Sequence, residues 1–507
     1  MKRGIDAHLR RYRMLLNSID AKGSEAEVIW RSAKLGSWES ISPRWWEAGG
    51  RIRFRFKAFE RDLLYWVSSI QRAADGLKVL LANPRGPLPE MLQIMWSGLS
   101  PEAGLHPEGS WKLAQRWLRE RFPGCEILSA SRRPDLAWSL SGSFLRVVFR
   151  AHGKDCLALI AHSAAENDGA RSALTQALLW LSAKGRRTRM RTISKVFLLV
   201  PSRYSGILYH RAQFLNPERV RVEVWEFDEG HAEGREVRRS SCPPAPVEDR
   251  DFRWPVLGPF RWSTQLAQVL DLAPDLIRRY PRFQDYDSLR LWGLEFAQVM
   301  GPDRDRIYYG VGSQRTELAE DNFVCLRSLV DEILFYRRPD SPDTQHPYYR
   351  AQAERWLEAL ILEQVGELFP ELSPESVYPQ IPVYLGKDAG RVDILGADRR
   401  GNLVVMELKV SEDPDLPLQS LDYWGRVVQH NLNGDFERRG YFSGMRLSRG
   451  TPKIYLVSPV FSFHDSTERV LGFLSPNLEV WKIAVNEDWR CGVKVLRRIH
   501  LRCGDLV

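Results

Sequence analysis

Two stretches of the chain, about 240 residues apart, carry the same features in the same order. Each starts with a His-Pro pair, at His106 and at His346, and continues into an amphipathic helical pattern that contains Arg-Trp-Leu. Two strand-like runs, a helical run with a tryptophan, a basic segment and a further apolar strand then follow in both stretches. This shared order predicts a duplication of whole domains rather than a solenoid of short repeats.

The length of the chain fits such a duplication, because 507 residues are too many for one hydrophobic core. We expect an α/β protein with four regions. Residues 1–105 are predicted to be mostly helical, and residues 106–242 form the first copy. Residues 243–345 begin as a proline-rich linker and continue through helical runs such as YDSLRLWGLEFAQVM and LRSLVDEILFYRR, and residues 346–507 form the second copy.

The second copy contains charged residues inside an otherwise apolar hairpin. The run from 392 to 410 reads as two strands joined by the turn residues DRRGN. Side chains alternate along a strand, so Glu407 and Lys409 share one face, and pairing of the two strands brings Asp393 near Glu407. Two neighbouring carboxylates repel each other unless a cation lies between them, and Mg²⁺ prefers such oxygen ligands. The pattern therefore favours a metal-dependent phosphodiester hydrolysis site over the solvated face of an edge strand.

Helices on both sides of this hairpin carry further polar residues. Gln419 and Tyr423 stand four residues apart, on one face of the helix predicted after the second strand. Upstream, the amphipathic run AERWLEALILEQVGEL carries Glu354, Glu358 and Glu363, any one of which would serve as a further metal ligand. A solvated helix face is the alternative for each of these glutamates.

Together these motifs resemble the PD-(D/E)XK superfamily of nucleases. The run GRVDILGADRRGNLVVMELK is most similar to the branch with NucS-type endonucleases and archaeal-style resolvases, and QSLDY is similar to the QxxxY motif of RecB-type members. The resemblance covers roughly residues 350–485. It implies a restriction-endonuclease-like fold, in which a central mixed sheet is flanked by helices, and hydrolysis of nucleic acid with Mg²⁺ or Mn²⁺.

The resemblance also implies roles for the hairpin residues. Asp393 and Glu407 would be metal ligands, with the carbonyl of Leu408 as a third, and Lys409 would be the catalytic lysine. The proline that usually precedes the aspartate in this family is absent, since Val392 takes its place.

Further roles follow for the helices. Glu354 best matches the helix acid of the family and would be a metal ligand, with Glu358 as the alternative. Gln419 and Tyr423 would support the site or contact DNA.

The first copy lacks these residues. When the two hairpins and the two tryptophan-containing helices are aligned by sequence, the aspartate, glutamate and lysine are replaced by Val148, Ala161 and Ser163, and the QxxxY pair by Thr175 and Leu179. The apolar framework remains, so the first copy is expected to be a degenerate domain without catalysis. The fold then does not need the acids of the second copy.

The composition indicates which kind of binding partner and which cellular compartment to expect. The net charge of +9 favours an anionic partner such as nucleic acid. The six cysteines form no CxxC pair, so a zinc site or a disulfide framework is not expected and a reducing cytoplasm fits. No run is long and apolar enough to cross a membrane.

We therefore predict tandem restriction-endonuclease-like domains, the first degenerate and the second an endonuclease that acts on nucleic acid, with DNA favoured over RNA. The first copy would bind DNA or pair with the second as a pseudo-dimer, and arginines in the basic segment 184–195 would contact phosphates. The alternatives are an inactive DNA-binding protein with a nuclease fold and a scaffold in a repair or defence complex. The strandedness of the substrate stays open.

Overall fold

The computed structural model is a mixed α/β protein whose chain divides into two compact units. It describes residues 26–30, 33–37, 39–48, 51–58, 61–73, 76–82, 90–96, 107–135, 138–161, 169–187, 193, 195–227, 237–239, 263–283, 286–300, 306–312, 315–385 and 388–501. Within these residues, no helix has the length and apolar character needed to span a membrane. The linker predicted at 243–262 lies outside the described residues.

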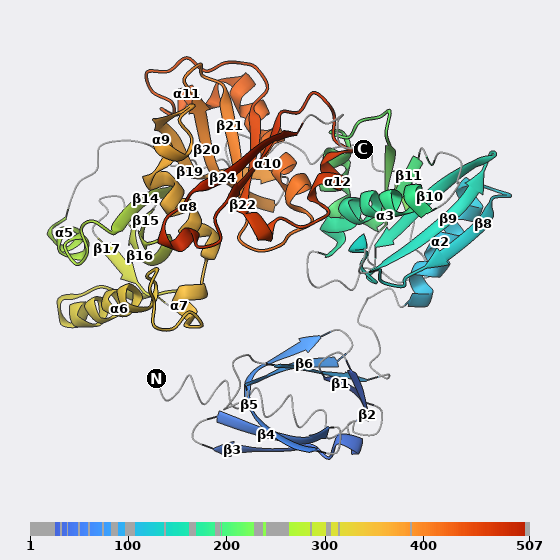
Figure 1. Cartoon of the computed structure of the whole chain (residues 1–507), viewed down its shortest axis with the longest axis horizontal. Helices are drawn as coiled ribbons and strands as arrows, with labels where there is room; N and C mark the ends of the chain where they lie inside the picture. Colours follow the sequence, from blue (N-terminus) through green and yellow to red (C-terminus); the bar gives the residue numbers. More distant parts are fainter. Residues whose placement is uncertain are drawn as a thin grey trace. The chain divides into compact units, whose positions relative to one another are not determined.

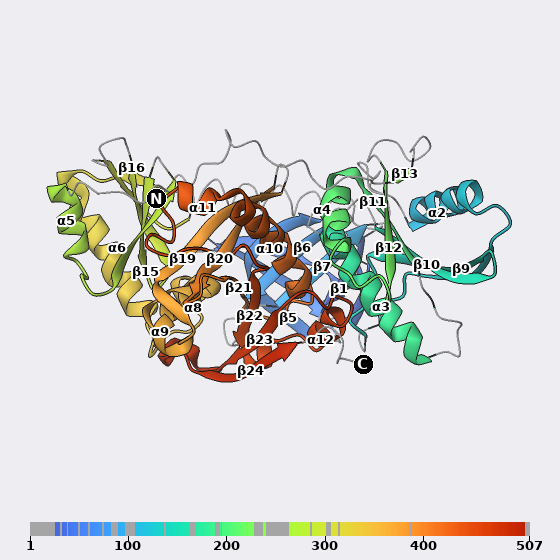
Figure 2. The same cartoon turned by 90° about the horizontal axis from the view of Figure 1, so that it is seen from above.

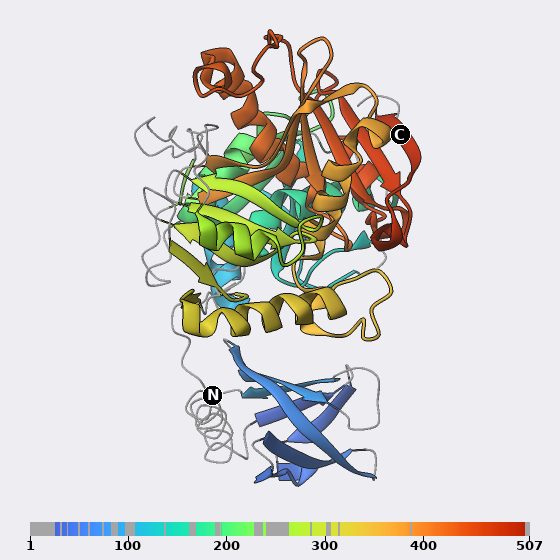
Figure 3. The same cartoon turned by 90° about the vertical axis from the view of Figure 1, so that its left-hand side faces the viewer.

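The first unit is an antiparallel sheet of seven strands in the order β2-β1-β7-β6-β5-β4-β3, curved around its own core (Figure 3). Its strands are β1 (Ala26–Trp30), β2 (Ala33–Ser37), β3 (Arg44–Ala48), β4 (Arg51–Ala58), β5 (Arg61–Ala73), β6 (Gly76–Ala82) and β7 (Glu90–Trp96). The prediction of a mostly helical region over residues 1–105 is wrong for this described part. In β4, Ile52, Phe54 and Phe56 are buried while Arg55 and Lys57 are exposed, and this period of two is the strand period.

The first α/β domain lies in the second unit and is built on a six-stranded sheet in the order β13-β12-β11-β10-β9-β8 (Figure 1). Its strands are β8 (Glu126–Ser131), β9 (Phe144–Ala151), β10 (Lys154–Ala161), β11 (Lys195–Pro201), β12 (Arg221–Phe227) and β13 (Val237–Arg239). Its helices are α2 (Pro107–Arg121), α3 (Ala173–Arg187) and α4 (Ser202–Ala212). The predicted hairpin and the helix with the Arg-Trp-Leu sequence are confirmed.

An intervening domain follows, with a five-stranded antiparallel sheet in the order β14-β15-β16-β17-β18. Its elements are α5 (Thr264–Leu270), β14 (Ile277–Phe283), β15 (Tyr286–Leu291), β16 (Leu294–Met300), β17 (Arg306–Tyr309), β18 (Thr316–Glu317) and α6 (Phe323–Tyr336). The helix predicted over LRSLVDEILFYRR is confirmed as α6. The helix predicted over YDSLRLWGLEFAQVM is wrong, because Trp292 and Gly293 both adopt positive φ and turn this run into the β15–β16 hairpin.

The second α/β domain carries a six-stranded sheet in the order β19-β20-β21-β22-β23-β24. Its strands are β19 (Leu372–Leu385), β20 (Asp388–Asp398), β21 (Leu403–Leu408), β22 (Lys453–Pro459), β23 (Val480–Val485) and β24 (Val495–Leu501). Its helices are α7 (Pro347–Arg350), α8 (Ala353–Glu363), α9 (Val365–Leu368), α10 (Leu416–Asn433), α11 (Asp435–Arg438) and α12 (Thr467–Leu471). Gly401 forms the predicted turn between β20 and β21 with a φ of 80°.

The two α/β domains have the same topology. In each, the first three strands pair antiparallel, the next two pairings are parallel and the last is antiparallel. In each, a long helix (α3 or α10) connects the third strand to the fourth, and a shorter one (α4 or α12) connects the fourth to the fifth. A parallel pair needs such a crossover, so the helices occur at the same places in both domains.

The two α/β domains contact each other through equivalent segments. Asn216 N–H donates to the Phe473 carbonyl and Ser475 N–H donates to the Phe214 carbonyl, each over 2.8 Å. These residues belong to FLN at 214–216 and FLS at 473–475, which occupy the same place after α4 and after α12. Helix α3 of the first domain contacts α12 of the second, and α10 of the second contacts α4 of the first (Figure 2). Each domain therefore contributes equivalent helices to the contact.

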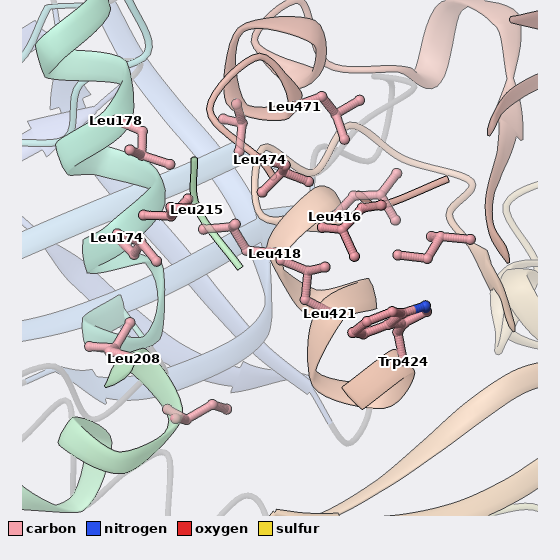
Figure 4. Close-up of a cluster of buried hydrophobic side chains, with 14 of the residues drawn as sticks. Leu174, Leu178, Leu208, Leu215, Leu416, Leu418, Leu421, Trp424, Leu471 and Leu474 are labelled. Atoms are coloured by element: carbon pink, nitrogen blue, oxygen red, sulfur yellow. The ribbon is translucent and has the colours of Figure 1, made fainter. Parts of the chain in front are cut away.

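Leucines from both domains fill this contact and belong to one continuous core, together with Trp424 (Figure 4). They are Leu174, Leu178, Leu208 and Leu215 of the first domain and Leu416, Leu418, Leu421, Leu471 and Leu474 of the second. Full burial of one leucine side chain is worth about 1.5–3 kcal/mol, so the shared core holds the two domains together as one unit.

Candidate active site

The β20–β21 hairpin brings Asp393, Glu407 and Lys409 together, as the sequence predicted. The backbone N–H of Leu408 donates to Asp393 Oδ2 over 2.9 Å, and this contact ties the aspartate to the neighbouring strand. Lys409 Nζ lies 3.9 Å from Glu407 Oε1. Val405, two residues before Glu407, packs in the core shared with α10, so this face of β21 looks toward that helix.

Helix α8 places Glu354 at the same cluster. Its Oε1 lies 3.6 Å from Lys409 Nζ, so the lysine stands between Glu354 and Glu407. The side chain of Glu354 is 40% exposed, whereas that of Glu407 is 3% exposed. Glu354 is therefore the acid of this group that solvent reaches most easily.

Glu358, one turn further along α8, is buried, accepts two hydrogen bonds and forms an ion pair with a third side chain. Arg355 NH1 lies 2.7 Å from its Oε2, Gln380 Nε2 donates to the same oxygen, and Arg290 NH1 lies 3.6 Å from its Oε1. Arg355 and Gln380 also reach Asp393 Oδ1, over 3.5 and 3.4 Å. Glu358 is thus connected to Asp393 through shared donors, while Glu354 is connected to Glu407 through Lys409.

Burial dominates the electrostatics of the cluster. It raises the pKa of Glu407 well above its usual value, and the nearby Asp393 carboxylate raises it further. Burial also raises the pKa of Asp393, which Arg355 partly offsets, and the pKa of Glu354, which Lys409 partly offsets. The surroundings of each of these acids therefore disfavour its charged form. A bound cation would stabilise that charged form.

The opposite shift holds for the lysine. Burial lowers the pKa of Lys409, but Glu407 and Glu354 outweigh this effect and the pKa is raised. Lys409 therefore stays an ammonium group at neutral pH, as a role in stabilising anionic charge requires.

Glu407 Oε2 is buried and accepts no hydrogen bond from the part of the chain that the structure describes. A buried carboxylate oxygen without a donor is costly, and a hard divalent cation would satisfy it. Within the residues that the structure describes, no three carboxylate, histidine or cysteine side chains converge as a complete metal site. Mg²⁺ is commonly held by one or two carboxylates, with waters and substrate phosphates as its other ligands, so Asp393 and Glu407 fit this ion as a pair.

The QxxxY pair on α10 also lies near the cluster. Gln419 Nε2 donates to the Tyr423 hydroxyl over 3.3 Å. Burial raises the pKa of Tyr423, and the carboxylate of Glu407 adds to the rise. Tyr423 is therefore close enough to Glu407 to feel its charge, and Gln419 orients the tyrosine.

Strand register shows what the first α/β domain has at the same positions. Lys195 and Lys453 both open the central parallel strand, and their pairing places Leu159 where the second domain has Glu407. The antiparallel partner of Leu159 is Arg146, which therefore corresponds to Asp393.

By the same register, Ala161 takes the place of Lys409. The sequence alignment that matched Val148, Ala161 and Ser163 to the three site residues is thus wrong by two residues. A shift of two preserves the faces of a strand, so the apolar pattern alone does not reveal it.

Sequence reasoning missed three residues of the site: Arg355, Gln380 and Arg290. Gln380 belongs to β19 and stands opposite Asp393 in the register of β19 with β20. It adopts a φ of 59°, an uncommon conformation for a residue with a side chain. Arg290 comes from β15 of the intervening domain, and only the tertiary fold brings it to α8. Of the three, only Arg355 had a signal in the sequence, as the neighbour of Glu354.

The basic segments of the two copies were candidates for phosphate contacts, and the structure describes them to different extents. In the second copy, Arg438 pairs with Asp435, and Arg449 lies 2.9 Å from Glu437, so these arginines take part in local ion pairs. The aromatic residues Tyr441 and Phe442 are buried in the core. Half of the segment 184–195 in the first copy lies outside the described residues.

Comparisons with known proteins give little guidance. No family model matches the chain, and no curated protein matches it. Among solved structures, it is similar to a chain of the structure titled "Structure of EndoMS-dsDNA2 complex", at 16% sequence identity and a TM-score of 0.14. The match covers 38% of this chain and 84% of that chain. A TM-score this low does not establish a shared fold.

Proposed function

We propose that the second α/β domain hydrolyses phosphodiester bonds of nucleic acid, with DNA as the favoured substrate, using Mg²⁺ or Mn²⁺. The observation that carries this proposal is the pair of Asp393, which is 13% exposed, and buried Glu407, with a Glu407 oxygen that has no hydrogen-bond partner among the described residues and an ammonium group beside it. Pairs of carboxylates of this kind bind hard cations, and a neighbouring lysine suits an anionic substrate. The net charge of +9 also favours a polyanion.

In this proposal Asp393 and Glu407 would hold the metal ion, and Glu354 would be a third acid beside it. When bound, the ion supplies Lewis acidity, which lowers the pKa of a water and polarises the phosphate. Lys409, fixed between Glu354 and Glu407, orients the attacking water or offsets negative charge that builds up on the phosphate.

Three further residues support this arrangement in the proposal. Arg355 and Gln380 reach Asp393 Oδ1, so they hold the carboxylate in place. Tyr423 lies on the α10 side of the acidic cluster. Burial and the nearby Glu407 raise the pKa of its hydroxyl, so the hydroxyl stays protonated and can donate a hydrogen bond.

The second candidate is an inactive DNA-binding protein that keeps the fold. Two observations favour it: among the described residues, no three acids converge as a complete metal site, and Arg355 NH1 already stands 3.5 Å from Asp393 Oδ1. Calorimetric titration with Mn²⁺ separates the candidates. Binding that Glu407→Gln removes supports the nuclease, and the lack of any binding supports the inactive protein.

The decisive experiment is a cleavage assay on linear, single-stranded, flapped and mismatched DNA and on RNA, with Mg²⁺ or Mn²⁺ and with EDTA. The test variant is Glu407→Gln, and the control is Glu375→Gln, which alters an exposed glutamate of the same domain. We expect metal-dependent cleavage that the test variant loses and the control keeps. Cleavage that survives Glu407→Gln, or binding without cleavage on every substrate, would refute the proposal.

A further inference from the structure

The first α/β domain has a cavity of about 300 Å³ over β8, β9 and α3. Its polar lining includes Ser129, Ser131, Arg133, Arg146 and Lys184. Arg146 is the residue that corresponds in strand register to Asp393 of the second domain. The position that carries a carboxylate in one domain therefore carries a guanidinium in the other.

Arg146 is 5% exposed, and its guanidinium is held by uncharged acceptors. NH1 donates to the Ser141 carbonyl over 2.9 Å, and NH2 donates to the Arg133 carbonyl. Carbonyl oxygens orient the planar group without neutralising its charge. Within the part of the chain that the structure describes, no carboxylate forms an ion pair with Arg146, although Asp135 lines the same cavity.

The contrast with Arg150, on the same strand, shows what is unusual here. Arg150 Nε donates to Asp155 Oδ1 over 2.8 Å, and its side chain is 42% exposed. Its charge is therefore both paired and solvated. Burial lowers the pKa of Arg146, and the carboxylate of Asp135 only partly offsets this. A buried cation without a paired anion favours an anionic ligand.

We propose that this cavity binds a backbone phosphate of nucleic acid through Arg146, Arg133 and Lys184. Among the described residues that line the cavity, three are basic and one, Asp135, is acidic, so this lining has a positive balance. The hydroxyls of Ser129 and Ser131 add neutral donors, and both residues are exposed, so an extended polyanion reaches them. Arginine matches the planar arrangement of phosphate oxygens with two parallel N–H groups.

The reciprocal contact between the domains suits the binding of one duplex by both of them. Equivalent segments meet across that contact, at Leu215 and Leu474, so the cavity and the acidic cluster occupy corresponding places on the two domains. A duplex also has two related strands. One domain then holds a phosphate of one strand while the other acts on the second strand. This inference rests on the proposed function only for the identity of the substrate.

The test measures duplex binding by fluorescence anisotropy in EDTA, so that it does not depend on catalysis. Full-length chains with Arg146→Gln, Lys184→Gln or the control Arg150→Gln are compared over a range of salt concentrations. We expect Arg146→Gln to weaken binding roughly tenfold and to lower the salt slope by about one, and the control to change neither. Arg146→Lys should restore part of the affinity, because the charge remains.

Several outcomes would overturn the inference. Equal affinity losses in Arg146→Gln and Arg150→Gln would mean a general basic surface. No loss in either Arg146→Gln or Lys184→Gln would mean that the cavity does not contact the duplex. Lys184→Gln serves as the second variant, since Lys184 is less buried than Arg146 and its loss endangers folding less.

Inorganic phosphate at millimolar concentration is the second probe. If it raises the melting temperature of the unaltered chain but not of Arg146→Gln, while both bind duplex equally, the cavity binds free phosphate and the nucleic-acid assignment is wrong. Loss of duplex binding in Arg146→Gln together with intact cleavage in Glu407→Gln would refute the proposed function and leave this inference standing.

Discussion

The two α/β domains share strand order, strand directions and crossover helices, and they differ in the side chains beneath the long helix. The second domain has Asp393 and Glu407 where the first has Arg146 and Leu159. The first domain forms the same sheet without either acid, so the fold does not need them. Since burial of the two acids raises their pKa values and costs stability, their retention in the second domain points to chemistry.

A second difference lies in the contact between the domains. On one side, Arg211 is 2% exposed and pairs with Asp422 through two hydrogen bonds of 2.9 and 2.7 Å. When FLN at 214–216 is aligned with FLS at 473–475, Arg211 matches Val470. When Trp180 is aligned with Trp424, Asp422 matches Leu178. Val470 and Leu178 are both buried and apolar. One half of the contact is thus ionic and the other apolar. Such asymmetry favours pairing of unlike domains over pairing of like ones.

The largest expected effect comes from making the second domain resemble the first. The variant Glu407→Leu replaces the proposed metal ligand with leucine, the residue type that the first domain has at the corresponding position, Leu159. Cleavage should fall at least about a thousandfold, roughly 4 kcal/mol of transition-state stabilisation. The melting temperature should stay or rise, because a buried carboxylate oxygen without a partner is removed. Retained cleavage, with Glu375→Gln as control, would show that the acids are not catalytic.

The next effect breaks the ionic half of the contact. Arg211 also pairs with Asp415 over 2.9 Å, so Arg211→Val leaves both Asp422 and Asp415 without their cation. The free energy of unfolding in urea should fall by about 3–5 kcal/mol. Adding Asp422→Leu copies the apolar half and should recover part of this loss, since Asp415 stays without its arginine. A double variant no more stable than Arg211→Val would contradict the matching of the two halves.

A smaller effect concerns the closest approach of α10 to α4. A Cβ built on Gly425 would lie 2.8 Å from His210 Nε2 and 3.4 Å from Phe214 Cζ. Glycine to alanine in a helix usually adds about 1 kcal/mol of stability, but here the overlap should reverse the sign and cost about 1–3 kcal/mol. Urea denaturation of Gly425→Ala measures the loss. His210→Ala in the same chain should reduce it, and additive losses would argue against this contact.

The smallest effect is a pH dependence. Burial raises the pKa of Glu358 from 4.5 to about 7, against the opposing influence of Arg355 and Arg290. The folded state therefore binds a proton more tightly than the unfolded state. The stabilising contribution of the protonated group is complete below pH 4.5 and is lost as the pH rises through about 7.

Unfolding measured in EDTA between these pH values tests this dependence. The unaltered chain should lose more stability with rising pH than Glu358→Gln, whose side chain does not titrate. Parallel curves for the two proteins would show that Glu358 does not titrate in this window.

Much of the second domain was predictable, because its signals are local. Alternation along β21 put Glu407 and Lys409 on one face, and the turn before it brought Asp393 close. The 3.6-residue period of α8 made Glu354 and Glu358 neighbours. The first unit was mispredicted as mostly helical, although buried and exposed residues alternate along β4 with the period of a strand.

The sequence by itself determined the duplication, the order of elements in both copies and the residues of the acidic cluster, since periodicity and turns act over a few residues. The tertiary structure alone decided the strand register that replaces Asp393 by Arg146 in the first domain. It also decided the arrival of Arg290 from the sheet of the intervening domain, the approach of Gln380 from β19, and the buried pair of Arg211 with Asp422. Register shifts of two leave every face unchanged, and contacts between distant segments depend on packing that no local pattern encodes.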